Sequence, residues 1–307
     1  MPKFSIQKAI QINVSVEEAF ESVWDFRQWN SWSPWIIAEP DCELSYADDG
    51  KSYTWDGKII GSGQMEVLEE LPGNCIQYRL TFLKPWKSVS DVTFLFAQKD
   101  EGVEVTWTMN GSLPWFMFFM KSMMTAAIGM DYERGLNMLK DHLETGEVPS
   151  KLEFQGVVDF QGIKYLGVRS RCAIPEIGPK MQKDFGRMVS WLKEQEVESN
   201  GKPFAIYHDF QIAKGITEFT CCIPVNSIST KLPDEMLSSE LPNCKAYQIK
   251  HTGPYRHLGN AWSAGIMHSR AKVFRQDRKA PTFEIYESDP HTTPENDLVT
   301  VLHFPLK

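Results

Sequence analysis

A carboxylate set among aromatic residues is the most chemically informative feature of this 307-residue sequence. Glu284 lies in the segment Phe283-Glu284-Ile285-Tyr286, whose alternation is typical of a strand. A half-buried carboxylate can attract a cationic ligand that also contacts ring faces, or act as a general base with a pKa raised by burial. The alternative interpretation is an exposed strand residue with a surface partner.

Tyr286 shares the predicted strand face of Glu284, and Tyr255 lies at a predicted helix start, Gly253-Pro254-Tyr255. A tyrosine can orient a ligand or donate a proton, but a buried tyrosine also commonly satisfies its hydroxyl in the core. No catalytic residue is assigned on this basis. If the site is catalytic, Glu284 and Tyr255 are the candidates.

The second half of the sequence repeats itself at an interval of about 80 residues. Each repeat, at about 152–230 and 241–307, predicts a strand, a helix and two strands. Two such units would form a pseudo-twofold domain with a cleft between them. The matching segments are 204–207 with 283–286 (offset 79), and 223–224 with 304–305 and 168–169 with 249–250 (offset 81).

Aligning the repeats predicts which strand residues share a face. We expect a mixed face, formed by Ala205 and several polar residues, to line the cleft, and the apolar face of Phe204, Ile206, Phe283 and Ile285 to meet the helices. The predicted ligand contacts of the cleft are Tyr207, Thr220, Cys222, Tyr255, Trp262, Glu284, Tyr286, Val301 and His303.

The sequence predicts no metal and no cofactor. His251, His257 and His268 do not have the spacing of helical zinc ligands, and the GxSxG, HExxH and phosphate-loop motifs are absent. His303 is isolated on its strand, which favours a histidine satisfied in the core or cleft over a general base.

The first half of the sequence predicts a curved antiparallel sheet that grips a long helix. Residues 4–14, 65–67, 76–82, 92–96 and 103–109 alternate as half-buried strands. Ser15 is suited to cap a first helix. Apolar residues at helical spacing over 132–143 predict a last helix that ends near Gly146 and lies across the inner face of the sheet.

The inward-facing residues of this half are rich in aromatic side chains and methionine, so they can line a ligand cavity or form an ordinary core. Trp29, Trp32 and Trp35 can likewise form an aromatic mouth or pack beneath the first helix. The candidate cavity residues are Trp55, Met65, Tyr78, Phe82, Phe94, Trp107, Met109, Phe116, Met120 and Met124.

The apolar segment 113–130 carries a single charge, Lys121. A charge at the centre of a membrane span costs about 2.5–3.5 kcal/mol, so we expect a core or pocket-lining element, such as a lid.

Composition indicates a globular chain of about two domains. The net charge of −8 argues against general binding to nucleic acid or anionic lipid. Residues 1–150 carry −10 (12 Lys and Arg against 22 Asp and Glu), whereas residues 151–307 carry +2. The six cysteines show no CxxC pair and no signal peptide is evident, so we expect a cytoplasmic protein.

Residues 1–147 resemble the START-like (SRPBCC) superfamily of polyketide cyclases and lipid or hydrophobic-ligand carriers. The resemblance rests on VEEAFESVWDFRQWNSWSPW, GSGQMEV and the closing GMDYERGLNMLKDHLE segment. It implies a helix-grip fold with an apolar cavity.

Residues 152–307 resemble the GyrI-like effector-binding domains of multidrug-sensing transcription regulators, through HTGPYRHLGNAW and FEIYESDPHTTPENDLVTVLHFPL. The resemblance implies a cleft for lipophilic, often cationic compounds, with the strand carboxylate at Glu284 and pocket aromatics at Tyr255, Trp262 and Tyr286. Some family members hydrolyse electrophilic ligands. In that family the last strand often carries a second glutamate, and the corresponding residue here is Val301.

The sequence therefore predicts an α+β protein in which a helix-grip domain precedes a duplicated βαββ GyrI-like domain, joined by a linker at 145–151. We expect it to bind a small hydrophobic or cationic ligand as a sensor or regulator-related protein. It would have no direct contact with nucleic acid and no stable membrane insertion, and a protein partner or homo-oligomer is compatible with it. One alternative is a hydrolase of electrophilic small molecules. The other is lipid carriage or membrane contact, with residues 113–130 as an exposed apolar lid.

Overall fold

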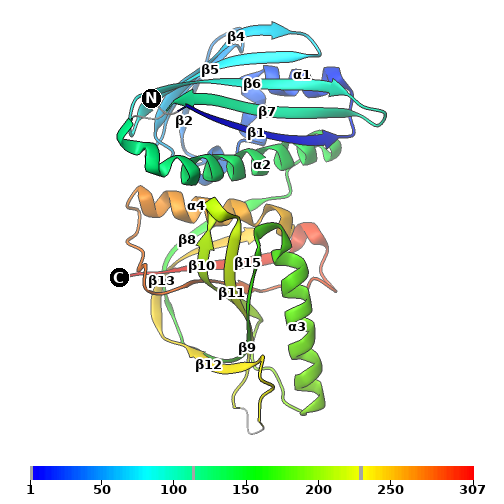
Figure 1. Ribbon diagram of the computed structural model, residues 1–307, viewed down its shortest axis with the longest axis vertical. Helices are drawn as coiled ribbons and strands as arrows, with labels where there is room; N and C mark the ends of the chain where they lie inside the picture. The colour runs from blue at the N-terminus through cyan, green and yellow to red at the C-terminus, as the bar shows by residue number, and fades with distance from the viewer. Residues whose placement is uncertain (1–2, 113–114, 228–230) are drawn as a thin grey trace. The chain divides into compact units, whose positions relative to one another are not determined.

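The computed structural model describes residues 3–112, 115–227 and 231–307, with the side chains of 115–117 excepted. It divides the chain into two compact units, which are described separately (Figure 1). Unit 1 comprises Met1–Pro149 with Ile266–Ala271, and unit 2 comprises Ser150–Gly265 with Lys272–Lys307.

The described residues of unit 1 form a seven-stranded antiparallel sheet in the order β1-β7-β6-β5-β4-β3-β2. The alternation over the long strands is confirmed, but β2 and β3 are too short to give a clear pattern. The elements are β1 (Lys3–Ile12), α1 (Val16–Trp24), β2 (Glu43–Tyr46), β3 (Ser52–Asp56), β4 (Ser62–Leu71), β5 (Cys75–Lys84), β6 (Ser88–Gln98), β7 (Val103–Ser112) and α2 (Lys121–Thr145), with 3-10 helices at Phe26–Ser31, Ile36–Ala38 and Trp115–Met120.

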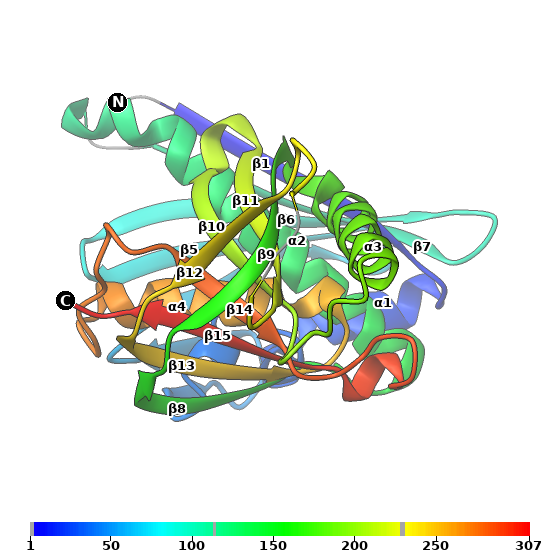
Figure 2. The ribbon, with the colours of Figure 1, turned by 90° about the horizontal axis from the view of Figure 1, so that it is seen from below.

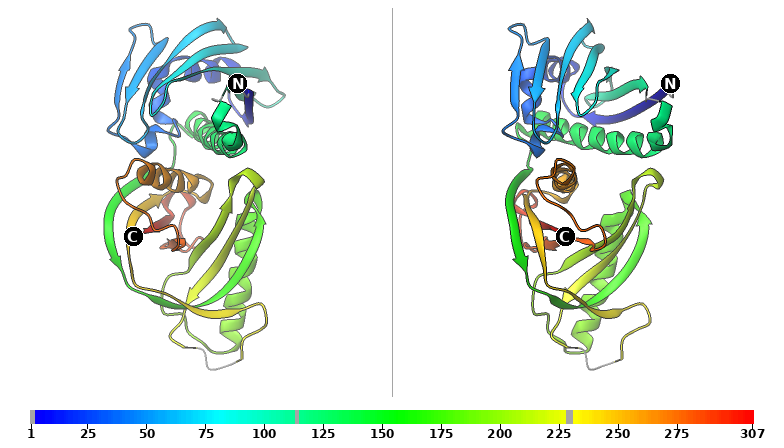
Figure 3. Two further views of the ribbon diagram at one scale, coloured as in Figure 1. Left: turned by 60° about the vertical axis from the view of Figure 1, so that its left-hand side comes forward. Right: turned by 90° about the vertical axis from the view of Figure 1, so that its left-hand side faces the viewer.

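The two helices of unit 1 begin and end where the sequence indicates. Ser15 caps α1, since its Oγ accepts a hydrogen bond from the backbone N–H of Glu18 at 3.1 Å. Gly146 ends α2 with a φ of 83°, a left-handed conformation that favours glycine. The sheet curves around α2, which Figure 3 (left) shows nearly end-on. This is the helix-grip arrangement.

The apolar segment 113–130 differs from the prediction. Residues 113 and 114 lie outside the described residues, and the remainder forms the 3-10 helix Trp115–Met120 and the first turns of α2. Phe118 and Phe119 are 64% and 71% exposed, so this part is not a core element. Within the described ranges, no helix combines the length and the apolar character needed to cross a membrane.

The described residues of unit 2 form an eight-stranded antiparallel sheet in the order β12-β9-β11-β10-β14-β15-β13-β8 (Figure 2). Its elements are β8 (Lys151–Phe160), β9 (Ile163–Ala173), α3 (Ile177–Glu194), β10 (Phe204–Gln211), β11 (Ile216–Pro224), β12 (Leu237–Leu241), β13 (Cys244–Thr252), α4 (Gly259–Arg270), β14 (Thr282–Tyr286) and β15 (Val299–Pro305), with 3-10 helices at Ile174–Glu176, Ile212–Lys214, Tyr255–His257 and Glu295–Asp297.

Strand pairing reproduces the sequence duplication. Ser170 of β9 pairs with Phe219 of β11, and the residues 81 positions later, His251 and Thr300, pair in the same way between β13 and β15. Each repeat contains one more initial strand than predicted, giving ββαββ. These extra strands are exchanged, because β8 pairs with β13 of the second repeat and β12 with β9 of the first.

The sheet of unit 2 curls so that one face closes on itself. The rings of Phe160 in β8 and Phe283 in β14 lie 4.7 Å apart, although β13 and β15 separate these strands in the sheet. The inner face of the curl is packed with apolar residues such as Tyr165, Phe204 and Cys222. Helix α3 packs on the other face, through Met181 and Met188 against residues of β9 and β11.

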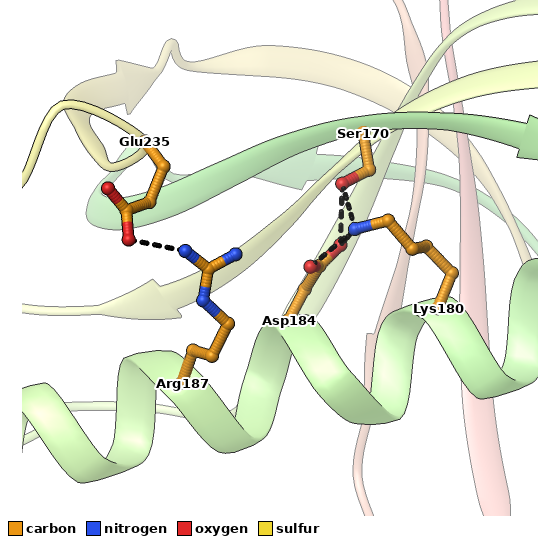
Figure 4. A network of polar contacts seen from close by, with 5 residues as sticks. All are labelled: Ser170, Lys180, Asp184, Arg187 and Glu235. Carbon is orange, nitrogen blue, oxygen red and sulfur yellow. Dashed lines mark hydrogen bonds and ion pairs between the residues drawn. The ribbon is translucent and has the colours of Figure 1, made fainter.

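A buried polar network fixes α3 on β9 (Figure 4). Asp184 is fully buried, and its carboxylate accepts hydrogen bonds from Ser170 Oγ at 2.6 Å and from Lys180 Nζ at 2.6 and 2.8 Å. Lys180 Nζ also donates to Ser170 Oγ at 2.7 Å. Further along the helix, Arg187 pairs with Glu235. A buried charge needs such partners, so the network restricts where α3 can sit.

Helix α4 approaches β15 closely at Gly265, where an added Cβ would lie 2.1 Å from the ring of Phe304. We therefore expect Gly265→Ala to lower the free energy of unfolding of unit 2 by about 1–3 kcal/mol through overpacking. Gly186 in α3 has open space around it, so Gly186→Ala should raise the free energy of unfolding of unit 2 by up to about 1 kcal/mol. Scanning calorimetry of the full chain measures both changes, and equal transition temperatures would contradict the packing of α4.

Candidate ligand-binding site

Glu284 lies at the centre of unit 2 with its carboxylate surrounded by aromatic donors. The residue is 1% exposed. Its Oε1 accepts hydrogen bonds from Tyr286 Oη at 2.7 Å and from Tyr207 Oη at 2.9 Å, and its Oε2 accepts one from Trp262 Nε1 at 2.7 Å. Neutral groups therefore satisfy both oxygens.

The two repeats contribute equivalent tyrosines to this one carboxylate. Tyr207 and Tyr286 occupy the same position in the two repeats. The pseudo-twofold axis passes between the paired residues Ala205 and Glu284, because Phe204 pairs with Ile285 and Ile206 with Phe283. The first repeat has alanine where the second has the glutamate. The site is consequently a single one at the junction of two similar halves.

Each tyrosine of the site contacts one helix. Trp262 of α4 meets the ring of Tyr207 at a centroid distance of 4.7 Å. Met181 of α3, which is 81 positions before Trp262, has its Sδ 3.4 Å from Tyr286 Oη. Met181 was not identified as a site residue from the sequence. The repeat offset carried the signal, since it places Met181 opposite the predicted Trp262.

Tyr255 gives the cluster its most exposed ring. Its ring meets Tyr286 edge-on at 5.9 Å, and the residue is 41% exposed. Tyr207, Trp262 and Tyr286 are half-buried, while Glu284 beneath them is buried. The aromatic rings therefore lie between the surface of unit 2 and the buried carboxylate of Glu284.

Burial sets the protonation behaviour of the cluster. It raises the pKa of Glu284, and the hydrogen bonds from Tyr286, Trp262 and Tyr207 act in the opposite direction. Burial, followed by the nearby Glu284 carboxylate, raises the pKa of Tyr207 and Tyr286 well above that of a free tyrosine. Both phenols therefore remain donors at neutral pH.

Four predicted cleft residues do not lie with Glu284, so the expectation of one shared face is wrong. Directly paired residues of an antiparallel sheet point to the same side. Phe204 and Ile206, whose parity is opposite to that of Ala205, pair with Cys222 and Thr220. Phe283 and Ile285 pair in the same way with His303 and Val301. Thr220, Cys222, Val301 and His303 thus lie on the inner face of the curl.

The prediction of which face of the sheet contacts the helices is also wrong. The face that contains Glu284 meets α3 and α4, whereas the apolar face packs against itself inside the curl. The repeats fix which residues are equivalent, but not the register between β10 and β11. A slip of one residue in that register moves every side chain to the other face.

Inside the curl, His303 is a packed core residue. It is 3% exposed, its ring stacks on Phe283 at 4.6 Å, and its Nε2 lies 2.9 Å from Gln248 Nε2. Burial lowers its pKa to about 4, so the ring is neutral at physiological pH. Thr220 is engaged by His208, with 2.7 Å between Oγ1 and Nε2.

The predicted cavity residues of unit 1 pack mainly into an aromatic core. The ring of Trp107 meets those of Trp29, Trp32, Trp35, Phe94 and Tyr132, the last stacked at 3.9 Å. Trp29 and Trp32 thus pack inside rather than forming a mouth. Buried in this core are Trp55, Met65, Tyr78, Phe94, Trp107 and Met109, and packed against it are Phe82 and Met124.

Two further predicted residues of unit 1 lie away from that core. Met120 is half-buried at the end of its 3-10 helix, and the side chain of Phe116 lies outside the described part of the chain. A cleft of about 650 Å³ borders β2, β3 and β4, with Trp55 the one predicted cavity residue in its lining and Asp56, Lys84 and Lys87 among its charged groups. Its lining is more polar than the predicted apolar cavity.

The six cysteines are free thiols. In the described ranges, no cluster of three or more His, Cys, Asp or Glu side chains is placed to hold a metal ion. The chemistry of the Glu284 cluster therefore rests on one carboxylate, two phenols, an indole and the ring of Tyr255.

Comparisons with known proteins give two family matches. Residues 3–144 match the model of the family described as polyketide cyclase/dehydrase and lipid transport. Residues 157–307 match that of the GyrI-like small molecule binding domain. A comparison with curated proteins finds no match.

Similar solved structures include a cryo-EM structure of an EcmrR–DNA complex, which is 15% identical, with 62% of this chain and 68% of that chain covered and a TM-score of 0.44. The EcmrR C-terminal domain is 14% identical, with 52% and 98% covered and a TM-score of 0.40. A protein from Mesorhizobium loti is 15% identical, with 46% and 97% covered and a TM-score of 0.37.

Buried neutral histidines predict acid sensitivity of unit 2. The pKa values of His251 and His303 are lowered to about 4, whereas an unfolded histidine titrates near 6.5. The unfolded state therefore binds more protons, and stability falls as the pH falls from about 6.5 towards 4. At pH 4.5, His303→Gln should retain about 2 kcal/mol more of its neutral-pH stability than the original chain.

Urea unfolding at a series of pH values measures this difference. The exposed His291 provides the control, since His291→Gln should follow the pH profile of the original chain. A profile unchanged by His303→Gln would show that this ring is not held neutral by burial.

Proposed function

Since residues 3–144 form a domain of the polyketide cyclase/dehydrase and lipid transport family and residues 157–307 a GyrI-like small molecule binding domain, we propose that the chain is a small-molecule sensor whose Glu284 site binds lipophilic cations. The expected setting is the cytoplasm. If the protein regulates transcription, a partner would supply the DNA contact.

The observation that carries this proposal is a buried carboxylate without a cationic partner. No ion pair joins Glu284 to a Lys, Arg or His side chain in the part of the chain that the structure describes. Three neutral hydrogen bonds reduce the cost of burying the charge, but they do not neutralise it. A ligand cation would supply the missing positive charge.

The rings determine what kind of cation suits the site. Tyr207, Tyr286 and Trp262 hold the carboxylate by their polar edges. An apolar, delocalised cation that displaced the neighbouring rings would contact their faces. Tyr255 lies on the exposed side of this group. We propose that Tyr255 and Tyr286 rotate when a ligand binds, because Glu284 is otherwise covered. A small hydrated cation would lack the apolar surface that repays this movement.

A hydrolase acting at the same site is the second candidate. The tyrosine hydroxyls beside Glu284 favour it, because they could donate to a leaving group while the carboxylate activates water. Both oxygens of Glu284 are already engaged, however, so a water molecule must first displace a phenol or the indole. This requirement favours binding over turnover. Mass spectrometry of an electrophilic ligand after incubation would reveal any product.

A lipid carrier would need space for a ligand inside the sheet of unit 1. Trp107 is in contact there with five other rings, so a ligand would have to displace part of the aromatic core. The family match supports ligand binding by this unit, but the packing does not favour enclosure of a lipid chain.

We expect Glu284→Gln to weaken binding of tetraphenylphosphonium about 100-fold, because the substitution removes the charge while preserving the side-chain shape. Isothermal titration calorimetry measures this change. Glu287 lies three residues along the chain and is exposed, so Glu287→Gln is the matched control and should bind as the original chain does. Equal affinities of the two variants would remove Glu284 from the proposed site.

Cation binding should also release a proton. Burial raises the pKa of Glu284 in the free protein, and a bound cation lowers it again. Around and below the raised pKa, affinity should therefore fall as the pH falls, and at higher pH it should reach a plateau. Titrations in two buffers of different ionisation enthalpy measure the released protons. A heat that does not depend on the buffer, at every pH, would contradict the linkage.

A further inference from the structure

One end of the sheet of unit 1 exposes a group of large apolar side chains. Strand register places the start of β1, the end of β7, the start of β6 and the end of β5 at this end. The hairpin between β5 and β6 and the 3-10 helix that follows β7 extend from it. Their exposed residues are Leu83, Trp86, Val89, Phe118, Phe119 and Met123, which we name the apolar end.

The exposure of these residues is large for a soluble unit. Phe118 and Phe119 are 64% and 71% exposed, and their rings meet edge-to-face at 6.0 Å. Trp86, near the tip of the hairpin, is 48% exposed. Single exposed apolar residues are ordinary, but a group of six at one end of a sheet is typical of an interaction surface.

Three exposed lysines that have no paired carboxylate in the described part of unit 1 lie around the apolar end. Lys3, Lys87 and Lys121 are exposed there, and none has a carboxylate partner among the described residues. The segments 3–15, 83–90 and 109–130 contain no Asp or Glu at all. This is notable because residues 1–150 as a whole carry a net charge of −10. The nearest carboxylates are Asp91, two residues after Val89 in β6, and Asp56, which pairs with Lys84.

Lys84, at the end of β5, is the fourth lysine at this end. Its Nζ lies 3.2 Å from Asp56 Oδ1, so its charge is partly compensated. Lys8 likewise pairs with Glu133, at 2.8 Å. Of the unpaired lysines, Lys87 follows Trp86 directly and Lys121 is two residues after Phe119. Figure 1 shows the start of β1, marked N, and the first turns of α2 at the same side of the unit.

We propose that the apolar end is a peripheral docking surface for anionic lipid bilayers. Phenylalanine and tryptophan side chains suit the boundary between headgroups and acyl chains, and lysine is attracted to anionic headgroups. The surrounding acidic surface would be repelled by the same membrane, so contact is restricted to this end.

The test uses the full chain and sedimentation with vesicles of phosphatidylcholine alone or mixed with phosphatidylglycerol. We expect binding to the anionic vesicles that weakens as salt rises. The double substitution Phe118→Ser, Phe119→Ser should reduce the partition coefficient at least tenfold. Lys87→Gln and Lys121→Gln should each reduce it about fivefold.

Leu71 offers a matched control, because it is 53% exposed at the opposite end of the same sheet. Leu71→Ser should bind vesicles as the original chain does. The proposal is overturned if the original chain does not bind anionic vesicles, or if Leu71→Ser and the double variant lose binding equally. It is also overturned if sedimentation velocity without vesicles shows a dimer that the double variant abolishes, since a second copy would then cover the apolar end.

Discussion

The hydrogen bonding of one buried carboxylate organises unit 2. A charge taken out of water is tolerated only when its hydrogen-bonding capacity is met, and Glu284 meets it with groups from three elements. Tyr207 comes from the first repeat, whereas Tyr286 and Trp262 come from the second. The strands must pair in one register, and α4 must lie against the sheet, before all three donors reach the carboxylate.

The duplication makes unit 2 approximately twofold symmetric, and the site is formed at a position where the two repeats differ. Ala205 faces Glu284 across the pseudo-twofold axis, so only one of two equivalent positions carries a charge. The helices differ in a similar way. Asp184 anchors α3 through a polar network, whereas Gly265, 81 residues later, lets α4 pack directly on Phe304. Equivalent positions in the two repeats thus hold α3 on the sheet by a polar network and α4 by close packing.

The sequence could predict elements and repeats because both depend on local patterns. Alternation identified the long strands, and Ser15 and Gly146 marked helix ends. Strand parity placed Tyr207 and Tyr286 with Glu284, whereas Trp262 was indicated only by the family resemblance. The register between β10 and β11 depends on tertiary packing, so Thr220 and Cys222 were placed on the wrong face. Likewise, apolar content could not distinguish a cavity around Trp107 from a core filled by Trp29 and Trp32.

The same limitation explains the segment that follows β7. A run of phenylalanine and methionine shows that the segment has a large apolar surface, but it does not show which part of the protein or which partner packs against that surface. In unit 1 the aromatic core is already dense, with Tyr132 of α2 stacked on Trp107 at 3.9 Å, and the first turns of α2 lie largely outside it. Phe118 and Phe119 therefore lie at the surface of the unit. Their exposed apolar area costs about 25 cal/mol per Å² in water. Because the neighbouring unpaired charges are lysines, a surface that is both anionic and apolar beneath complements this end in charge and in polarity.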